Sequence, residues 1–82
     1  MILKMYALKD RLNDYAYPIP FINDEMAKRY WRDTCFSNET IQNNPGDFSF
    51  DEIGIWDSEK GHVTPAKNGK ILKPIDAAEV KK

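Results

Sequence analysis

The sequence predicts a small α+β domain in which a single helix packs on a mostly antiparallel sheet. Apolar residues alternate with a period of two on both sides of a central segment, which is typical of strands. The central segment, residues 23–36, instead places apolar residues at helical spacing behind a good N-cap, Asn23. The expected order is therefore strand, strand, helix, strand, strand. The chain of 82 residues makes one domain at most.

Residues 2–10 (ILKMYALKD) form the first expected strand. Both of its faces carry apolar side chains: Ile2, Tyr6 and Leu8 on one, and Leu3, Met5 and Ala7 on the other. We therefore expect a central strand that is covered on both sides.

Residues 15–22 (YAYPIPFI) form the second expected strand, with Tyr15, Tyr17, Ile19 and Phe21 on one face. Pro18 and Pro20 occupy the opposite phase. Proline cannot donate a ladder hydrogen bond, so this strand is expected at an edge of the sheet. Another subunit can pair with an exposed edge.

The helix expected from Asn23 to about Phe36 separates its basic and apolar residues. At 100° per residue, one half carries Met26, Tyr30, Thr34, Ala27, Trp31 and Cys35, with Trp31 near the border. Lys28, Arg32 and Arg29 form a separate stripe. Glu25 lies three and four residues before Lys28 and Arg29, and Asp33 lies four residues after Arg29, which is the spacing of ion pairs on a helix surface. Lys28 and Arg32 are expected to be the better-placed free cations.

Breaking residues follow the helix, and Pro45 is expected to open one short turn capped by Asn44. Residues 48–57 (FSFDEIGIWD) predict a strand whose apolar phase slips, which indicates a bulge or a short helical turn. Gly54 is a natural place for a kink. A hairpin turn ending at Gly61 and a return strand, residues 62–65, complete the domain of residues 1–65. Residues 66–82 predict a lysine-rich extended arm with a frayed or briefly helical end.

Charge is unevenly distributed, although the net formal charge is only −1. Residues 1–32 carry +2, residues 33–59 carry −7 and residues 60–82 carry +4. Such segregation can give a small protein a basic face. The alternative is that the central acids neutralise both ends in the fold.

Several classes of function are poorly supported. Cys35 and His62 are the only cysteine and histidine, which excludes an internal disulfide and a zinc site of paired Cys and His. We find no nucleophile–base arrangement, no phosphate-binding glycine loop and no calcium-loop spacing. A signal peptide and a membrane helix are also missing. We expect a soluble intracellular protein without catalytic activity, cofactor, metal or membrane contact.

Binding of nucleic acid has better support, because the chain supplies cations for phosphates and aromatic rings for stacking. Cations are expected from the turn, the helix and the tail: Arg11, Lys28, Arg32, Lys67, Lys70 and Lys73. Rings are expected from Tyr15, Tyr17 and Trp31, with Tyr30 and Trp56 as further candidates. The alternatives stay open that these rings are core residues and that the tail lysines only confer solubility.

Three stretches that together span residues 5–63 occur in an order and spacing found in one phage protein family. They read MYALKDRLNDYAYP, NDEMAKRYWRDT and NNPGDFSFDEIGIWDSEKGHV. With them, the chain resembles the small nonstructural DNA-binding protein of gokushovirus-type microviruses (Microviridae), bacteriophages with small circular single-stranded DNA genomes. The resemblance implies DNA binding and a part in the switch to single-stranded genome production, and it implies no catalytic residue. Gly46 departs from the family pattern, in which an acid is often present.

These observations lead to one hypothesis and one alternative. The hypothesis is a nonenzymatic homodimer that binds single-stranded DNA, or else double-stranded DNA, in viral DNA replication in the host bacterial cytoplasm. The alternative is a protein-interaction module that binds a host or viral replication protein through the acidic residues 47–59.

Overall fold

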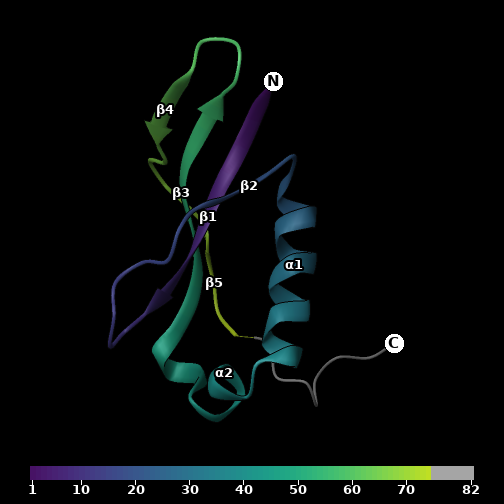
Figure 1. The fold of residues 1–82 in the computed structure, drawn as a ribbon, viewed down its shortest axis with the longest axis vertical. Coiled ribbons are helices and arrows are strands. Elements are labelled where there is room, and N and C mark those ends of the chain that lie inside the picture. The colour runs from purple at the N-terminus through teal and green to yellow at the C-terminus, as the bar shows by residue number, and fades with distance from the viewer. Residues whose placement is uncertain (75–82) are drawn as a thin grey trace.

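The computed structural model describes residues 1–74 and confirms the α+β class. The elements follow in the order β1 (Ile2–Asp10), β2 (Ile19–Phe21), α1 (Asp24–Ser37), α2 (Glu39–Asn43), the 3₁₀ turn η1 (Pro45–Asp47), β3 (Phe48–Asp57), β4 (His62–Pro65) and β5 (Ile71–Leu72). In Figure 1, the long helix α1 lies on one side of the strands, and the β3–β4 hairpin extends past its N-terminal end.

The sheet is antiparallel in every pairing, with the order β2-β1-β3-β4 and with β5 also paired to β3. The expected position of the second strand at an edge is confirmed. That strand is shorter than expected: only residues 19–21 pair continuously, and Tyr15 adds an isolated bridge to Lys9. Pro18, which cannot donate a ladder hydrogen bond, lies between these two places, whereas Pro20 is part of β2 and pairs with Met5.

The irregularity expected in the third strand is a bulge at Ile53. Met5 pairs with Gly54 and the next residue, Tyr6, pairs with Glu52, so Ile53 has no partner in β1. A Cβ atom at Gly54 would lie 2.9 Å from the carbonyl oxygen of Thr64, which explains why glycine stands there. The bulge shifts the phase of β3, so that Phe50 and Glu52 share the face of Tyr6, while Asp51 and Trp56 share the other.

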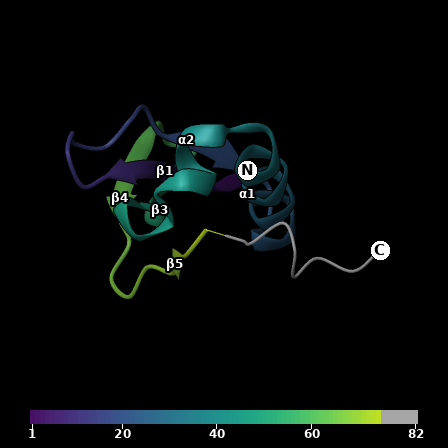
Figure 2. The ribbon, with the colours of Figure 1, turned by 90° about the horizontal axis from the view of Figure 1, so that it is seen from below.

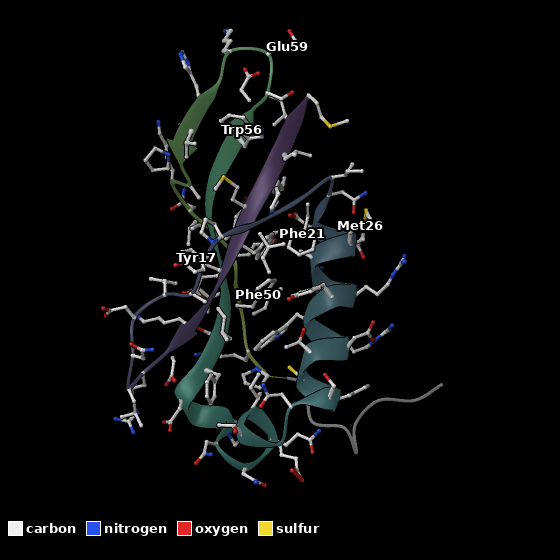
Figure 3. The ribbon with its side chains drawn as sticks, viewed as in Figure 1. Tyr17, Phe21, Met26, Phe50, Trp56 and Glu59 are labelled. Atoms are coloured by element: carbon white, nitrogen blue, oxygen red, sulfur yellow. The ribbon has the colours of Figure 1, made fainter. Side chains whose placement is uncertain are left out.

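The core lies between α1 and the sheet. Trp31 stacks on Phe50 at a ring-centroid distance of 5.2 Å, and Phe50 stacks on Tyr6 at 5.3 Å. Figure 3 shows Phe21 and Phe50 in this layer. The expected border position of Trp31 is wrong, since its side chain is 1 % exposed, whereas that of Tyr30 is 43 % exposed. The buried face of α1 is centred on Ala27, Trp31 and Cys35, and the indole Nε1 of Trp31 also donates to the carbonyl oxygen of Lys73, beside β5.

Two short elements were not expected. Asn38 caps α2 through a 3.1 Å hydrogen bond from the Ile41 amide, and Ile41 is buried in the core. Residues 71–72 join the sheet as β5, so this part of the expected arm lies against the domain. The frayed or briefly helical end falls outside residues 1–74. No helix within residues 1–74 is long and apolar enough to cross a membrane.

One face of the sheet points away from α1, and we call it the open face. The pairings place on it Leu3, Met5, Ala7, Lys9, Ser49, Asp51, Trp56, Val63 and Ile71. Figures 1 and 2 show α1 on the opposite side of the strands. The expected cover on both faces of β1 is therefore only partial: on the open face Ala7 is fully buried, whereas Leu3 and Met5 are half-buried.

Candidate nucleic-acid interface

A row of polar side chains crosses three strands on the open face. Lys9 pairs with Ser49 in the β1–β3 ladder. The β3–β5 ladder pairs Phe50 with Leu72, so the same register continued by one residue sets Lys73 beside Ser49. Adjacent strands lie about 4.8 Å apart, which puts the Cα atoms of the two lysines about 10 Å apart. Within residues 1–74, neither lysine has a carboxylate at ion-pair distance.

Tyr15 lies over the open face beside this row. Its phenol donates a 2.7 Å hydrogen bond to Oδ2 of Asp51, and this bond is the main reason that the pKa of Tyr15 is raised. The side chain remains 48 % exposed. The Lys9 ammonium lies 5.7 Å from the centroid of the ring. A solvent-facing aromatic ring and a cation are therefore neighbours on this face.

Asp51 is the buried acid of the open face, and only 6 % of it is exposed. Tyr15 donates to its Oδ2, whereas its Oδ1 has no hydrogen-bond partner within residues 1–74. Asp51 pairs with Ala7 in the ladder, so the Tyr15 side chain reaches across β1 over Ala7. This hydrogen bond therefore holds the Tyr15 ring in place, and it is also the one hydrogen bond that the Asp51 carboxylate receives within residues 1–74.

Arg11 extends the basic part of the open face beyond the end of β1. Its Nε donates to Oδ1 of Asp47 at 2.8 Å, and its amide donates to the Asp47 carbonyl at 2.8 Å. The side-chain hydrogen bond to Asp47 raises the pKa of Arg11 further above its ordinary value. The terminal nitrogens of the guanidinium make no bond within residues 1–74 and can still reach an anion.

The other half of the open face is apolar. Leu3 pairs with Trp56, and Trp56 pairs with Val63, so the three side chains form one cross-strand row. Trp56 is half-buried and Val63 is exposed. Figure 3 shows Trp56 in the half of the sheet next to the β3–β4 hairpin. The open face therefore combines a cationic end with an aromatic and aliphatic end.

Comparison with known protein families identifies the family of the chain. The sequence pattern of a family described as Phage ORF5 protein matches residues 3–80. The chain belongs to the Phage ORF5 protein family. No curated protein and no solved structure matches it.

Other residues predicted for the site of this Phage ORF5 protein lie away from the open face. Lys28 and Arg32 are on the outer side of α1, where Lys28 pairs with Glu25 at 3.8 Å and Arg32 with Asp33 at 3.6 Å. Both cations remain about half exposed and line a shallow hollow of about 320 Å³ together with Arg29. They form a second basic surface, separate from the first.

The remaining predicted residues are dispersed. Tyr17 is 91 % exposed on the loop between β1 and β2, where it borders a small apolar hollow next to α1. Trp31 presents no ring face to solvent, because it is buried in the core. Lys67 is exposed after β4 and has no ion pair within residues 1–74. The Lys70 side chain turns to the N-terminal end of α1, where its Nζ bonds Asp24.

Asp24 joins three segments of the chain, and its pKa is shifted more than that of any other carboxylate of residues 1–74. It accepts hydrogen bonds from Lys70 (2.6 Å), Tyr6 (3.0 Å) and Lys4 (3.1 Å). The Lys70 bond is the main cause that lowers the pKa of Asp24 to about 2; the Lys4 and Tyr6 bonds contribute, and partial burial opposes them. Lys70 is therefore a structural cation in this arrangement, which fastens the segment before β5 to α1.

The structure thus gathers three of the nine predicted residues, Arg11, Tyr15 and Lys73, on or beside the open face. The sequence predicted Trp56 only as a further candidate, and it did not select Lys9 or Ser49. A signal for Ser49 and Trp56 existed in the phase slip near Gly54, because the slip fixes the face of each β3 residue once the β1–β3 register is known.

Proposed function

We propose that this Phage ORF5 protein binds single-stranded DNA across the open face and acts, without catalysis, in phage genome replication. It would do so in the host bacterial cytoplasm, during the switch to production of single-stranded genomes. That the chain is a phage protein rests on the family match over residues 3–80.

The observation that carries the proposal is the pairing of rings and cations on a sheet face that no helix within residues 1–74 covers. Tyr15 and Lys9 are in contact, and Lys73 and Arg11 lie on the same side of the sheet. Proteins that bind single strands combine phosphate-neutralising cations with rings on which bases stack. A sheet face with exposed aromatic residues is one common form of that arrangement.

In the proposed mechanism, Lys9, Lys73 and Arg11 neutralise backbone phosphates, while Tyr15 and Trp56 stack on bases. Stacking on a ring typically contributes about 1–3 kcal/mol per base and does not depend strongly on the base. Stacking also requires unpaired bases, which favours a single strand over a duplex. A strand coated in this way would be unavailable as a template for the complementary strand.

The second basic surface on α1, with Lys28 and Arg32, can add sequence-independent attraction for phosphates. Lys28 lies 3.8 Å from Glu25 and Arg32 lies 3.6 Å from Asp33. We therefore propose that these two cations contribute less to the affinity for DNA than the cations of the open face. Tyr17 and Lys67 are exposed and remain available to a strand that leaves the open face.

The alternative function, a protein-interaction surface formed by residues 47–59, has less support because the fold already uses these acids. Asp47 pairs with Arg11, and Asp51 accepts from Tyr15. Asp57 accepts from the Glu59 and Lys60 amides in the hairpin turn. Few of these carboxylates are left to attract a basic partner.

We also propose a homodimer. The strand β4 lies at an edge of the sheet with all four residues exposed, and a second copy can pair with it. Light scattering over a range of concentrations tests this, and a monomeric mass at the highest concentration would refute it.

Titration of fluorescent oligonucleotides tests DNA binding. We expect the single strand to bind more tightly than the duplex of the same sequence. We also expect the logarithm of the affinity to fall linearly with the logarithm of the salt concentration, with a slope of about 0.7 per neutralised phosphate of a single strand. No binding at low salt would end the proposal. A preference for duplex would redirect it to double-stranded DNA.

A further inference from the structure

We propose that a hollow at the basic end of the open face is a built site for one phosphate group. This inference rests on the proposed function, since it assigns to this hollow one phosphate of the bound strand. The volume of the hollow is about 350 Å³, and Lys9, Arg11, Asp47, Ser49 and Lys73 line it, next to the backbone of η1 at Gly46. A water molecule occupies about 30 Å³ of liquid, so the space holds a phosphate group with its nearest waters.

The residues that line the hollow carry a net positive charge even after the Arg11–Asp47 ion pair is set aside. Asp47 is the one carboxylate of the hollow, and it is bonded to Arg11 at 2.8 Å. Lys9 and Lys73 have no acid at ion-pair distance within residues 1–74. Two uncompensated positive charges therefore border the hollow, which favours an anion: the single negative charge of a backbone phosphate diester, or inorganic phosphate.

Ser49 supplies a second and independent observation. It lies between the two lysines in the cross-strand row, and it is 8 % exposed. Its hydroxyl makes no hydrogen bond to any other residue of the chain between positions 1 and 74. Within residues 1–74 the Ser49 Oγ is not a fully buried unpaired atom, so water or a ligand in the hollow can reach it. A phosphate oxygen in the hollow would accept its hydrogen bond.

The groups around the hollow are held by the fold before any ligand arrives. Lys9 and Ser49 belong to the β1–β3 ladder. The backbone of Lys73 is fixed by the 2.9 Å hydrogen bond from the buried Trp31 indole. Such preorganisation reduces the entropy lost on binding. Because Lys9 also contacts the Tyr15 ring, a phosphate here lies next to a stacking position, as in one nucleotide of a strand.

Inorganic phosphate is the direct probe. Amide chemical shifts of the full chain are followed while phosphate replaces chloride at constant ionic strength. We expect saturable shifts confined to residues 9–11, 46–49 and 73. Ser49→Ala should weaken phosphate binding about tenfold, which corresponds to about 1.4 kcal/mol, because it removes a hydrogen bond to a charged group. Lys73→Met should weaken it as well.

Ser37→Ala, which removes an exposed hydroxyl at the end of α1, is the matched control and should leave phosphate binding unchanged. Should Ser49→Ala fail to fold, Lys73→Met alone decides, because its side chain is exposed. Shifts that never saturate, or that persist in Lys73→Met, would overturn the site.

The failure of this inference is distinguishable from failure of the proposed function. If the chain binds oligonucleotides but does not bind inorganic phosphate, the phosphate site is refuted and the proposal of DNA binding stands. Saturable phosphate binding by a chain that binds no oligonucleotide would support the site and refute DNA binding.

Discussion

Replacement of Asp24 by asparagine tests how the segment before β5 is fastened to the domain. The Asp24 carboxylate accepts from Lys70, Tyr6 and Lys4, which belong to three different parts of the chain. Asparagine keeps one acceptor oxygen, but it loses the charge and brings an NH₂ group toward two ammonium groups. We therefore expect Asp24→Asn to destabilise the fold and to loosen residues 66–74.

The size of the destabilisation follows from the pKa of Asp24, which is lowered from 3.8 to about 2 in the folded protein. One pKa unit corresponds to about 1.36 kcal/mol, so the charged form contributes about 2 kcal/mol to the free energy of unfolding. The side chain is only 15 % exposed, so solvent screening reduces this value little. For a domain of this size, about 2 kcal/mol lowers the Tm by roughly 8–16 °C.

The pH dependence has a definite sign. Because the folded-state pKa of Asp24 is below its unfolded value, its contribution is fully present above about pH 4 and is lost as the pH falls toward 2. The asparagine side chain of the variant cannot titrate. The stability difference between wild type and Asp24→Asn is therefore expected to be largest near neutral pH and to shrink steadily between pH 4 and pH 2.

Thermal unfolding followed by circular dichroism at several pH values measures both effects. Asp33→Asn is the control, since Asp33 is exposed and its pair with Arg32 spans 3.6 Å; it should change the Tm little. Equal stability of wild type and Asp24→Asn at pH 7 would refute the reasoning, as would a difference that does not change with pH.

Two further substitutions test the open face and the bulge. Tyr15→Phe removes the only hydrogen bond that the Asp51 carboxylate receives within residues 1–74, and we expect a loss of about 1–3 kcal/mol in chemical denaturation; unchanged stability would mean that Asp51 finds another donor. Gly54→Ala would place a Cβ 2.9 Å from the Thr64 carbonyl oxygen and should lower the Tm, whereas Gly46→Ala, with nothing within 4 Å, should not. Equal Tm values for the two alanine variants would contradict the close approach at the bulge.

Local rules predicted the long elements well. The alternation of residues 2–10, the cap at Asn23 and the phase slip before Gly54 correspond to β1, the start of α1 and the bulge. Each signal is contained within a few neighbouring residues, so the sequence carries it directly.

The elements that were not predicted depend on contacts between distant residues. β5 has only two residues, too few for a pattern, and forms because β3 offers a free edge beside Phe50. The buried Trp31 likewise contacts distant residues: it stacks on Phe50 and donates to the Lys73 carbonyl, 42 residues away in the chain. Helical angles alone could not place that partner.

Prediction of the candidate site was limited for the same reason. The types of residue were predictable, since cations and rings stand out in the sequence. Their assembly was not: Lys9, Ser49 and Lys73 form one row only because the β1–β3 and β3–β5 registers both hold. Lys28 and Arg32, the best candidates on the helix, lie on the other side of the domain because α1 covers the opposite face.

The central claim is that DNA occupies the open face and not the outer side of α1. Two double variants that each remove two positive charges test it: Lys9→Ala with Lys73→Ala, and Lys28→Ala with Arg32→Ala. Because the change in net charge is the same, a difference between them reports position. The measurement is the affinity for a fluorescent single-stranded oligonucleotide as a function of salt concentration.

We predict that the open-face variant binds much more weakly than wild type and that its salt slope is smaller by about 0.7, as expected for loss of the one phosphate that both lysines border. The helix variant should retain most of the affinity and nearly the full slope. Loss of binding in the helix variant, together with wild-type binding in the open-face variant, would contradict the account.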